Sequence, residues 1–227
     1  MRYTEFEQIM SPARMSRYLN ACEGNTKKAM TLYRLNLKLS QEMFTVISCF
    51  EVTLRNSINN CCLGKLGPDW LQNAAASGGI FDNPNCRLTS VNINEAISKL
   101  HANYTHSKLV AELGFGFWRY MFAQRQYSAT GRILLATFPA RPTTTPIAQY
   151  NNTYVFNQLA DINDIRNRIA HHEPICFQNG HPIKSTAFAR QHYLLIIKLL
   201  QWMGINEISL FYGLDHINDI CNDIDAL

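Results

Sequence analysis

The chain has 227 residues, of which 47% are hydrophobic and 17% are charged. This length can bury a large core without covalent staples, and the apolar fraction excludes a disordered chain. The seven cysteines are odd in number and form no C-x-x-C pair. That usage argues against a disulfide framework or a structural zinc site, so we expect no metal or cofactor and a reducing cytoplasm.

The net charge of +4 hides an asymmetry along the chain. Residues 205–227 contain five acids and no lysine or arginine, so residues 1–204 carry a surplus of nine positive charges. No acid lies in residues 113–160, which include Arg119, Arg125 and Arg132. A basic surplus is typical of proteins that bind polyanions, although an ordinary basic cytosolic protein has one too.

The sequence predicts neither a secretory signal nor a membrane-spanning segment. Glu5 and Glu7 stand where a secretory signal has its apolar run. The most apolar stretch, 193–203, is shorter than the roughly 20 residues that span a bilayer. We therefore expect a soluble, cytoplasmic protein.

The first half of the chain reads as helices. Ser11-Pro12 is a helix start, and that helix is expected to end near Gly24. A basic helix follows from Asn25 or Thr26, and Ser40 is expected to cap a third helix that runs to about Cys62. The third helix has an apolar stripe at helical spacing, formed by Phe44, Ile47, Phe50, Leu54 and Ile58.

The middle of the chain alternates loops and helices. Residues 73–89 are rich in Gly, Asn, Ser and Pro and predict a loop, and Ser90 is expected to cap a helix that runs to His101. Residues 106–123 predict a helix interrupted by two glycines. The proline- and threonine-rich stretch 139–146 predicts a rigid connector.

The last third contains the clearest helix. Its apolar residues at 155–169 step by three and four, and Pro174 stops it. A turn at 178–182, a helix over about 186–203 and an acidic final helix follow. Strand alternation is nearly absent, so we predict an all-α fold in a single domain over 1–227, with 139–146 as the one possible boundary.

The end of the 155–169 helix concentrates chemical groups. Arg166, Asn167, Arg168, His171 and His172 follow one another just before Pro174. Asn167 and His171 share one face, as do Arg168 and His172. An imidazole titrates near neutral pH, and guanidinium groups bind and stabilise phosphate charge.

This set of groups is sufficient for RNA cleavage without a metal. A histidine takes the 2′-hydroxyl proton or protonates the leaving 5′-oxygen, and an arginine steadies the phosphorane. DNA lacks the 2′-hydroxyl and is not an expected substrate. One helix supplies half of this arrangement, and a two-fold dimer would supply both acid and base. Simple capping of a helix end is the competing interpretation.

The motif resembles the Arg-polar-x-x-x-His signature of the HEPN superfamily, and residues 165–175 resemble its Abi-like, or abortive-infection, branch. Two further segments are similar to that branch, namely 50–56 and 115–119. The resemblance implies a HEPN-like helical bundle with extra helices at both ends of the chain. It also implies a homodimer that acts as a metal-independent endoribonuclease toxin.

The resemblance assigns roles residue by residue. Arg166 and His171 match the catalytic pair and Asn167 the polar second position. His172 lies beyond the short signature, and it and Arg168 are candidates for supporting roles. Such toxins are held in check by a partner, so an RNA or protein antitoxin is expected. Some carry a modified tyrosine three residues after the histidine, but this chain has Pro174 there. The alternative is a non-catalytic RNA-binding or regulatory HEPN protein.

Two further groups of side chains are candidates for supporting roles. Glu51 and Arg55 have the spacing of an ion pair within a helix, and they are equally suited to orienting the motif or clamping phosphate. The aromatic residues around 115–122 are expected to be mostly buried. The neighbouring arginines Arg119, Arg125 and Arg132 are therefore the better candidates for RNA contacts.

Overall fold

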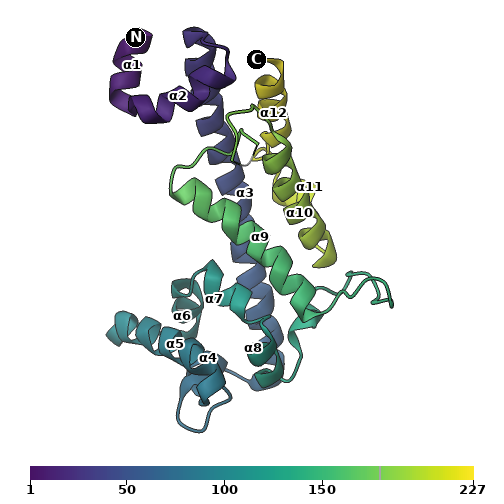
Figure 1. Ribbon diagram of the computed structural model, residues 1–227. Coiled ribbons are helices and arrows are strands. Elements are labelled where there is room, and N and C mark those ends of the chain that lie inside the picture. The colour runs from purple at the N-terminus through teal and green to yellow at the C-terminus, as the bar shows by residue number, and fades with distance from the viewer. Residues whose placement is uncertain (179) are drawn as a thin grey trace. The chain divides into compact units, whose positions relative to one another are not determined.

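The computed structural model describes residues 1–178 and 180–227, and this part of the chain is helical (Figure 1). It contains twelve α-helices and three short 3-10 helices, and its only β-pairing is an isolated antiparallel bridge between Phe177 and Lys184. The predicted all-α class is confirmed. The turn predicted at 178–182 includes Asn179, which lies outside the described residues. None of the helices in the described part is long and apolar enough to cross a membrane.

Two short helices open the chain. Helix α1 (Tyr3–Met10) was not predicted, whereas α2 (Pro12–Ala21) begins where the Ser-Pro pair indicates. The Ser11 hydroxyl accepts a hydrogen bond from the backbone nitrogen of Arg14, and Pro12 occupies the first helical position.

Helix α3 (Thr26–Leu66) runs for 41 residues without the break predicted at Ser40. That prediction was wrong because the buried positions continue through the serine, with Leu39 before it and Met43 after it. At the start of the predicted apolar stripe, Met43 is buried in place of Phe44. Phe44 is 45% exposed, while Phe50 and the later predicted positions are buried.

The chain forms two compact units, and α3 supplies residues to both. The first unit comprises residues 1–48, 164–198 and 207–227; the second comprises residues 49–163 and 199–206. Helix α9 (Asn152–Ala170) and helix α10 (Ala187–Trp202) also contribute to both units. The single domain over 1–227 stays a prediction.

Short helices make up most of the second unit (Figure 1). In chain order they are α4 (Trp70–Ala75), η1 (Pro84–Cys86), α5 (Arg87–Leu100), η2 (His101–Asn103), α6 (His106–Glu112), α7 (Phe115–Tyr120), α8 (Gln124–Ala129) and η3 (Leu134–Thr137). The loop predicted at 73–89 was partly wrong, since it contains η1 and the end of α4. Ser90 does not cap α5, because its hydroxyl donates to the Phe81 carbonyl at 2.7 Å and α5 begins at Arg87.

The aromatic segment of the second unit is mostly core, as predicted. Phe115, Trp118 and Phe122 are fully buried, and the Trp118 indole donates to the Leu113 carbonyl at 2.8 Å. The interruption predicted at Gly114 is confirmed, because α6 ends at Glu112 and α7 starts after Gly114, whereas the break predicted at Gly116 was wrong, since this glycine lies inside α7. Tyr120 is the exception to burial, with 53% of its surface exposed.

Helix α9 follows its predicted periodicity as far as Ile165, whereas the last predicted position, Ile169, is only half-buried. Val155, Leu159, Ile162 and Ile165 are fully buried, so one face of the helix lies in the core. The helix ends at Ala170, four residues before Pro174. Its last turn therefore presents the arginine and histidine motif away from the buried stripe.

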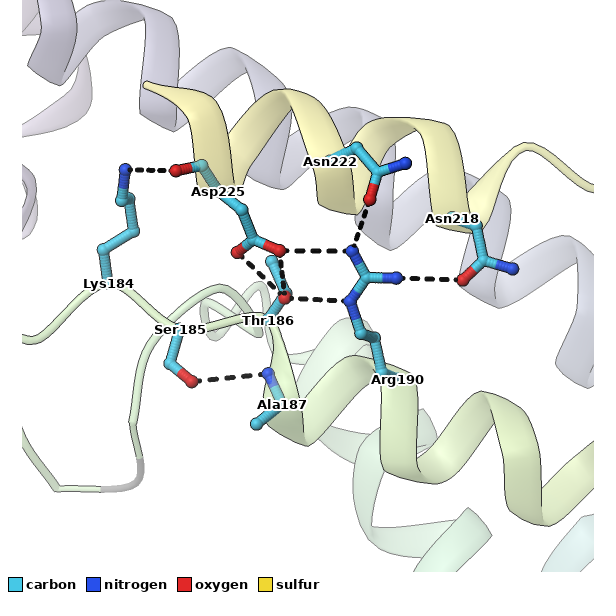
Figure 2. A network of polar contacts seen from close by, with 8 residues as sticks. All are labelled: Lys184, Ser185, Thr186, Ala187, Arg190, Asn218, Asn222 and Asp225. Atoms are coloured by element: carbon cyan, nitrogen blue, oxygen red, sulfur yellow. Dashed lines mark hydrogen bonds and ion pairs between the residues drawn. The ribbon is translucent and has the colours of Figure 1, made fainter.

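The acidic end of the chain packs into the first unit (Figure 2). After α11 (Glu207–Leu210), helix α12 (Ile217–Ala226) buries one apolar face. On α10, the Arg190 guanidinium donates to Asn218, Asn222 and Asp225 at 2.8–3.1 Å, and Asp225 also accepts from the Thr186 hydroxyl. The acidic helix is thus held by a positive charge within its own unit.

Candidate functional site

Arg166, Asn167 and Arg168 lie on the last two turns of α9, and His171 and His172 follow directly after its end at Ala170, all inside the first unit. Arg166, Asn167 and Arg168 are half-buried, whereas His171 and His172 are exposed. The backbone nitrogen of His171 donates to the Asn167 carbonyl at 2.9 Å, so the helical hydrogen bonding reaches His171 itself. The imidazole of His171 therefore stands on ordered backbone and faces solvent.

The helix ends in a Schellman motif centred on His172. Glu173 donates its backbone N–H to the Arg168 carbonyl at 2.8 Å, and His172 donates to the Ile169 carbonyl at 3.0 Å. His172 has a φ of +57°, a left-handed conformation that glycine usually supplies. This reverse turn fixes the direction in which the chain leaves His171.

A residue from α2 caps the same helix end. The Arg14 guanidinium donates to the His172 carbonyl at 2.7 Å, across 158 residues of sequence. Carbonyls at a helix C-terminus lack intrahelical partners and carry the negative end of the helix dipole, so a guanidinium suits this position. Arg14 is half-buried and holds its positive charge at the His172 carbonyl.

Arg168 is engaged by the protein rather than by solvent. Its Nε lies 3.5 Å from a Glu173 carboxylate oxygen, an ion-pair contact without hydrogen-bond geometry. Its Nη2 donates to the Pro174 carbonyl at 3.4 Å, and the guanidinium lies 4.5 Å from the centre of the Phe188 ring. The side chain is only 15% exposed, so Arg168 acts here as a packing and positioning group.

The segment after the motif is tied down at two further points. The buried Asn36 side chain on α3 accepts a hydrogen bond from the Ile175 backbone nitrogen at 2.9 Å. Arg17 on α2 donates to the His181 carbonyl at 2.8 Å and lies 4.5 Å from the centre of the Phe177 ring. Residues 172–178 and 180–181, called the strap below, are therefore held by α2 and α3 where the chain leaves α9.

The groups beneath the strap are neutral. Burial raises the pKa of the Cys176 thiol to about 12 and also raises the pKa of the Tyr18 hydroxyl. Tyr18 packs edge-on against Phe177, with ring centres 5.0 Å apart. Cys176 and Tyr18 therefore add no charge beneath the strap at neutral pH.

The sequence analysis missed Arg14, Arg17 and Asn36. The only signal in the sequence was that α2 and the start of α3 are basic, and such a surplus does not say which carbonyl a given arginine will reach. The contacts join residues more than 130 positions apart, and only the fold reveals them.

The remaining predicted site residues belong to the second unit. Glu51 and Arg55 are half-buried on α3, and their role toward Arg166 and His171 stays a prediction. The Arg119 guanidinium is stacked on Phe156, 4.4 Å from its ring centre. Arg125 and Arg132 are exposed.

The donor set at the end of α9 suits an anion. Guanidinium and imidazolium groups donate hydrogen bonds to phosphate oxygens, and Glu173 is the only carboxylate among the strap contacts described above. Within the described ranges, no group of three or more His, Cys, Asp or Glu side chains is arranged to hold a metal ion. The site is therefore best described as an exposed imidazole beside fixed positive charge.

Comparison with known proteins places this site in a family. The model of the Abi-like protein family matches residues 2–176, more than three quarters of the chain. The chain belongs to the Abi-like family. The matched region contains α2, the whole Arg166–His171 motif and the start of the strap, and membership implies a role related to abortive infection. No curated protein and no solved structure gave a match to this Abi-like chain.

Proposed function

We propose that this Abi-like protein is a metal-independent endoribonuclease whose active centre is built on Arg166, Asn167 and His171. The observation that carries the proposal is the exposed His171 at a helix end fixed by a Schellman turn and by Arg14. Membership in the Abi-like family adds independent support.

The reaction is an internal transesterification. One imidazole removes the proton from a ribose 2′-hydroxyl, and the resulting oxygen attacks the adjacent phosphorus. The bond from phosphorus to the 5′-oxygen breaks, and a second imidazole, in its protonated form, gives that oxygen a proton. The products are a 2′,3′-cyclic phosphate and a 5′-hydroxyl, and DNA is not cut because it has no 2′-hydroxyl.

Arg166 is assigned to the non-bridging phosphate oxygens. Charge builds up on these oxygens in the five-coordinate transition state, and a guanidinium meets them with two parallel hydrogen bonds. Asn167, one turn before His171 on the same face, is assigned to orienting the imidazole or the ribose. Arg168 and His172 are assigned to support, since Arg168 already contacts Glu173, Pro174 and Phe188.

A second copy of the chain completes the site in this proposal. The reaction needs one base and one acid, and a single α9 presents one His171. A two-fold axis beside the end of α9 would bring two motifs together and supply both groups. The biological role that follows is a toxin that arrests the infected cell and is restrained by an RNA or protein antitoxin.

The test is cleavage of RNA by the purified protein in EDTA. Wild-type protein is expected to cut, and Arg166→Ala and His171→Ala are each expected to lose at least about 100-fold in rate, because each removes a group that acts in the transition state. His181→Ala, an exposed histidine of the same unit, is the matched control and should keep wild-type activity.

Equal cleavage by the His171→Ala and wild-type proteins would contradict the proposal. Salt-dependent RNA binding without cleavage under any condition would instead favour a regulatory RNA-binding protein.

A further inference from the structure

A second candidate site lies in the second unit, in a hollow between η1 with α5 and α7 with α8. Its volume is about 930 Å³, within the range of small-molecule binding pockets. Two arginines, two aromatic rings and several amide side chains line it, and no acidic residue does. The residues that matter for the argument are Arg87, Arg125, Tyr120, Phe117 and Asn92.

Tyr120 offers a flat surface that is already held in place. Its ring packs edge-on against Phe156, with centres 5.5 Å apart, and the Arg119 guanidinium lies 5.3 Å from its centre. Arg119 is in turn stacked on Phe156. An exposed aromatic ring fixed in this way loses little entropy when a planar ligand stacks on it.

The two arginines give the hollow its charge. Arg87 is the first residue of α5 and Arg125 lies on α8, and both are exposed. No carboxylate lines the hollow to neutralise them. A phosphate group between them would gain charge-assisted hydrogen bonds.

A second hollow adjoins the first and indicates at which end of the first hollow a negatively charged group would bind. It shares Asn92 and Phe117 with the first hollow but is also lined by Glu95 and Glu112. Lys99 pairs with Glu112 at 3.4 Å, which leaves Glu95 as a negative charge on that side. A phosphate is therefore favoured near Arg87 and Arg125 and disfavoured beyond Asn92.

We propose that this hollow binds a nucleotide, with the base stacked on Tyr120 and the phosphate held by Arg87 and Arg125. Amides such as Asn92 present both donors and acceptors to the edge of a base. A free nucleotide and a nucleotide within an RNA chain offer the same chemistry. Binding itself does not depend on cleavage, and only the RNA-chain source rests on the proposed nuclease function.

The experiment is calorimetric titration of the His171→Ala protein, which does not cut RNA under the proposal. The ligands are adenosine 5′-monophosphate, adenosine and a hexamer of adenylate. We expect adenosine to bind more weakly than its monophosphate. Tyr120→Leu is expected to weaken binding by about fivefold or more, because stacking on an aromatic ring contributes that much, whereas Tyr120→Phe should bind normally.

Charge variants test the phosphate end. Arg87→Gln and Arg125→Gln are expected to weaken binding and to flatten its dependence on salt, because each removes one phosphate contact. Lys108→Gln removes the same charge from an exposed side chain of the second unit that does not line the hollow and should change nothing. All three side chains are exposed, so these changes leave the core intact.

The outcomes separate the two sources. Binding of the monophosphate that these variants weaken identifies a free nucleotide, and binding of the hexamer alone identifies a nucleotide in RNA. The proposal is overturned if neither ligand binds, or if binding is unchanged in Tyr120→Leu and Arg125→Gln. If nucleotide binding fails these tests while the wild-type protein still cleaves RNA, the proposed nuclease function is unaffected.

Discussion

His172 occupies the left-handed position after α9, where many helix ends carry glycine. A side chain in this conformation costs about 1 kcal/mol, since its Cβ crowds the following carbonyl oxygen. Histidine tolerates the conformation better than most residues, but it does not remove the cost. What the position contributes to the site is its carbonyl oxygen, which accepts the hydrogen bond from Arg14 at 2.7 Å.

The replacement His172→Gly separates the backbone of this residue from its imidazole. We expect the free energy of unfolding to rise by about 0.5–1 kcal/mol, because glycine adopts the left-handed conformation without strain and the Arg14 contact is retained. RNA cleavage should stay within about twofold of wild type. Denaturant unfolding and the cleavage rate check both expectations, and loss of cleavage would show that the imidazole takes part in the reaction.

At the scale of elements, α2 holds the end of α9 through two arginines with different targets. Arg14 reaches the carbonyl next to His171, whereas Arg17 reaches carbonyls at 178 and 181, farther along the strap. The pair therefore offers a matched comparison, because both variants would lose an arginine from one helix.

We expect Arg14→Ala to lower kcat for RNA cleavage by about tenfold with little change in KM, because the last turn of α9 loses the contact that fixes His171. Arg14→Ala and Arg17→Ala should each lower the free energy of unfolding by about 1–2 kcal/mol. Arg17→Ala should nevertheless leave kcat near wild type. Partial rescue by Arg14→Lys would support positioning through charge. An equal effect of Arg14→Ala and Arg17→Ala on kcat would contradict the assignment.

Local patterns were enough to predict some elements and not others. The start of α2 and the end of α9 were predictable, because Ser-Pro and Pro174 act on the residues beside them. The break at Ser40 was wrong, because serine is tolerated inside a helix and burial of Leu39 and Met43 continues through it. Ser90 failed as a cap for a similar reason, since its hydroxyl found the Phe81 carbonyl.

The candidate site was predictable in its chemical groups but not in its support. The motif at 166–171 is contiguous in sequence, so its residue types and helical faces could be read directly. Arg14, Arg17 and Asn36 act across more than 130 residues, and no local pattern indicates such contacts. The hollow beside Tyr120 likewise depends on how α5 meets α7 and α8.

For the whole molecule, buried thiols and tyrosine hydroxyls with raised pKa values make stability fall at alkaline pH, and Cys62 and Cys176 are two of these thiols. Burial raises the pKa of Cys62 and of Cys176 from the ordinary value of 9.0 to about 12. Above pH 9 the folded protein keeps these protons while the unfolded chain loses them. Stability is therefore fully present below pH 9 and falls as the pH rises toward 12.

We expect each thiol to reduce the free energy of unfolding by about 1.4 kcal/mol per pH unit above pH 9. Urea unfolding at pH 7, 9 and 10 in the presence of a reductant measures the slope. Cys176→Ala should remove one thiol's share of it. A slope that is the same in Cys176→Ala and in wild type would contradict the assignment.

The structure also shows which charged residues of the chain form contacts within the protein. The acidic end is not a free tail, because Arg190 and Thr186 bind Asp225 and hold α12 in the first unit. The basic surplus of residues 1–204 is partly used inside the protein, where Arg14, Arg17 and Arg168 contact carbonyls and rings. These guanidinium groups keep their charge, but fewer of their hydrogen-bond donors are left for a polyanion than the sequence alone indicates.

The central claim is that His171 cleaves RNA through the 2′-hydroxyl, and analysis of the cleaved ends tests it most directly. A short RNA incubated with wild-type protein in EDTA should give a 2′,3′-cyclic phosphate and a 5′-hydroxyl. The same RNA with a single 2′-deoxy nucleotide at the cleaved position should remain intact, and so should the natural RNA with His171→Ala protein. A 5′-phosphate product, or cleavage at the 2′-deoxy position, would contradict the account.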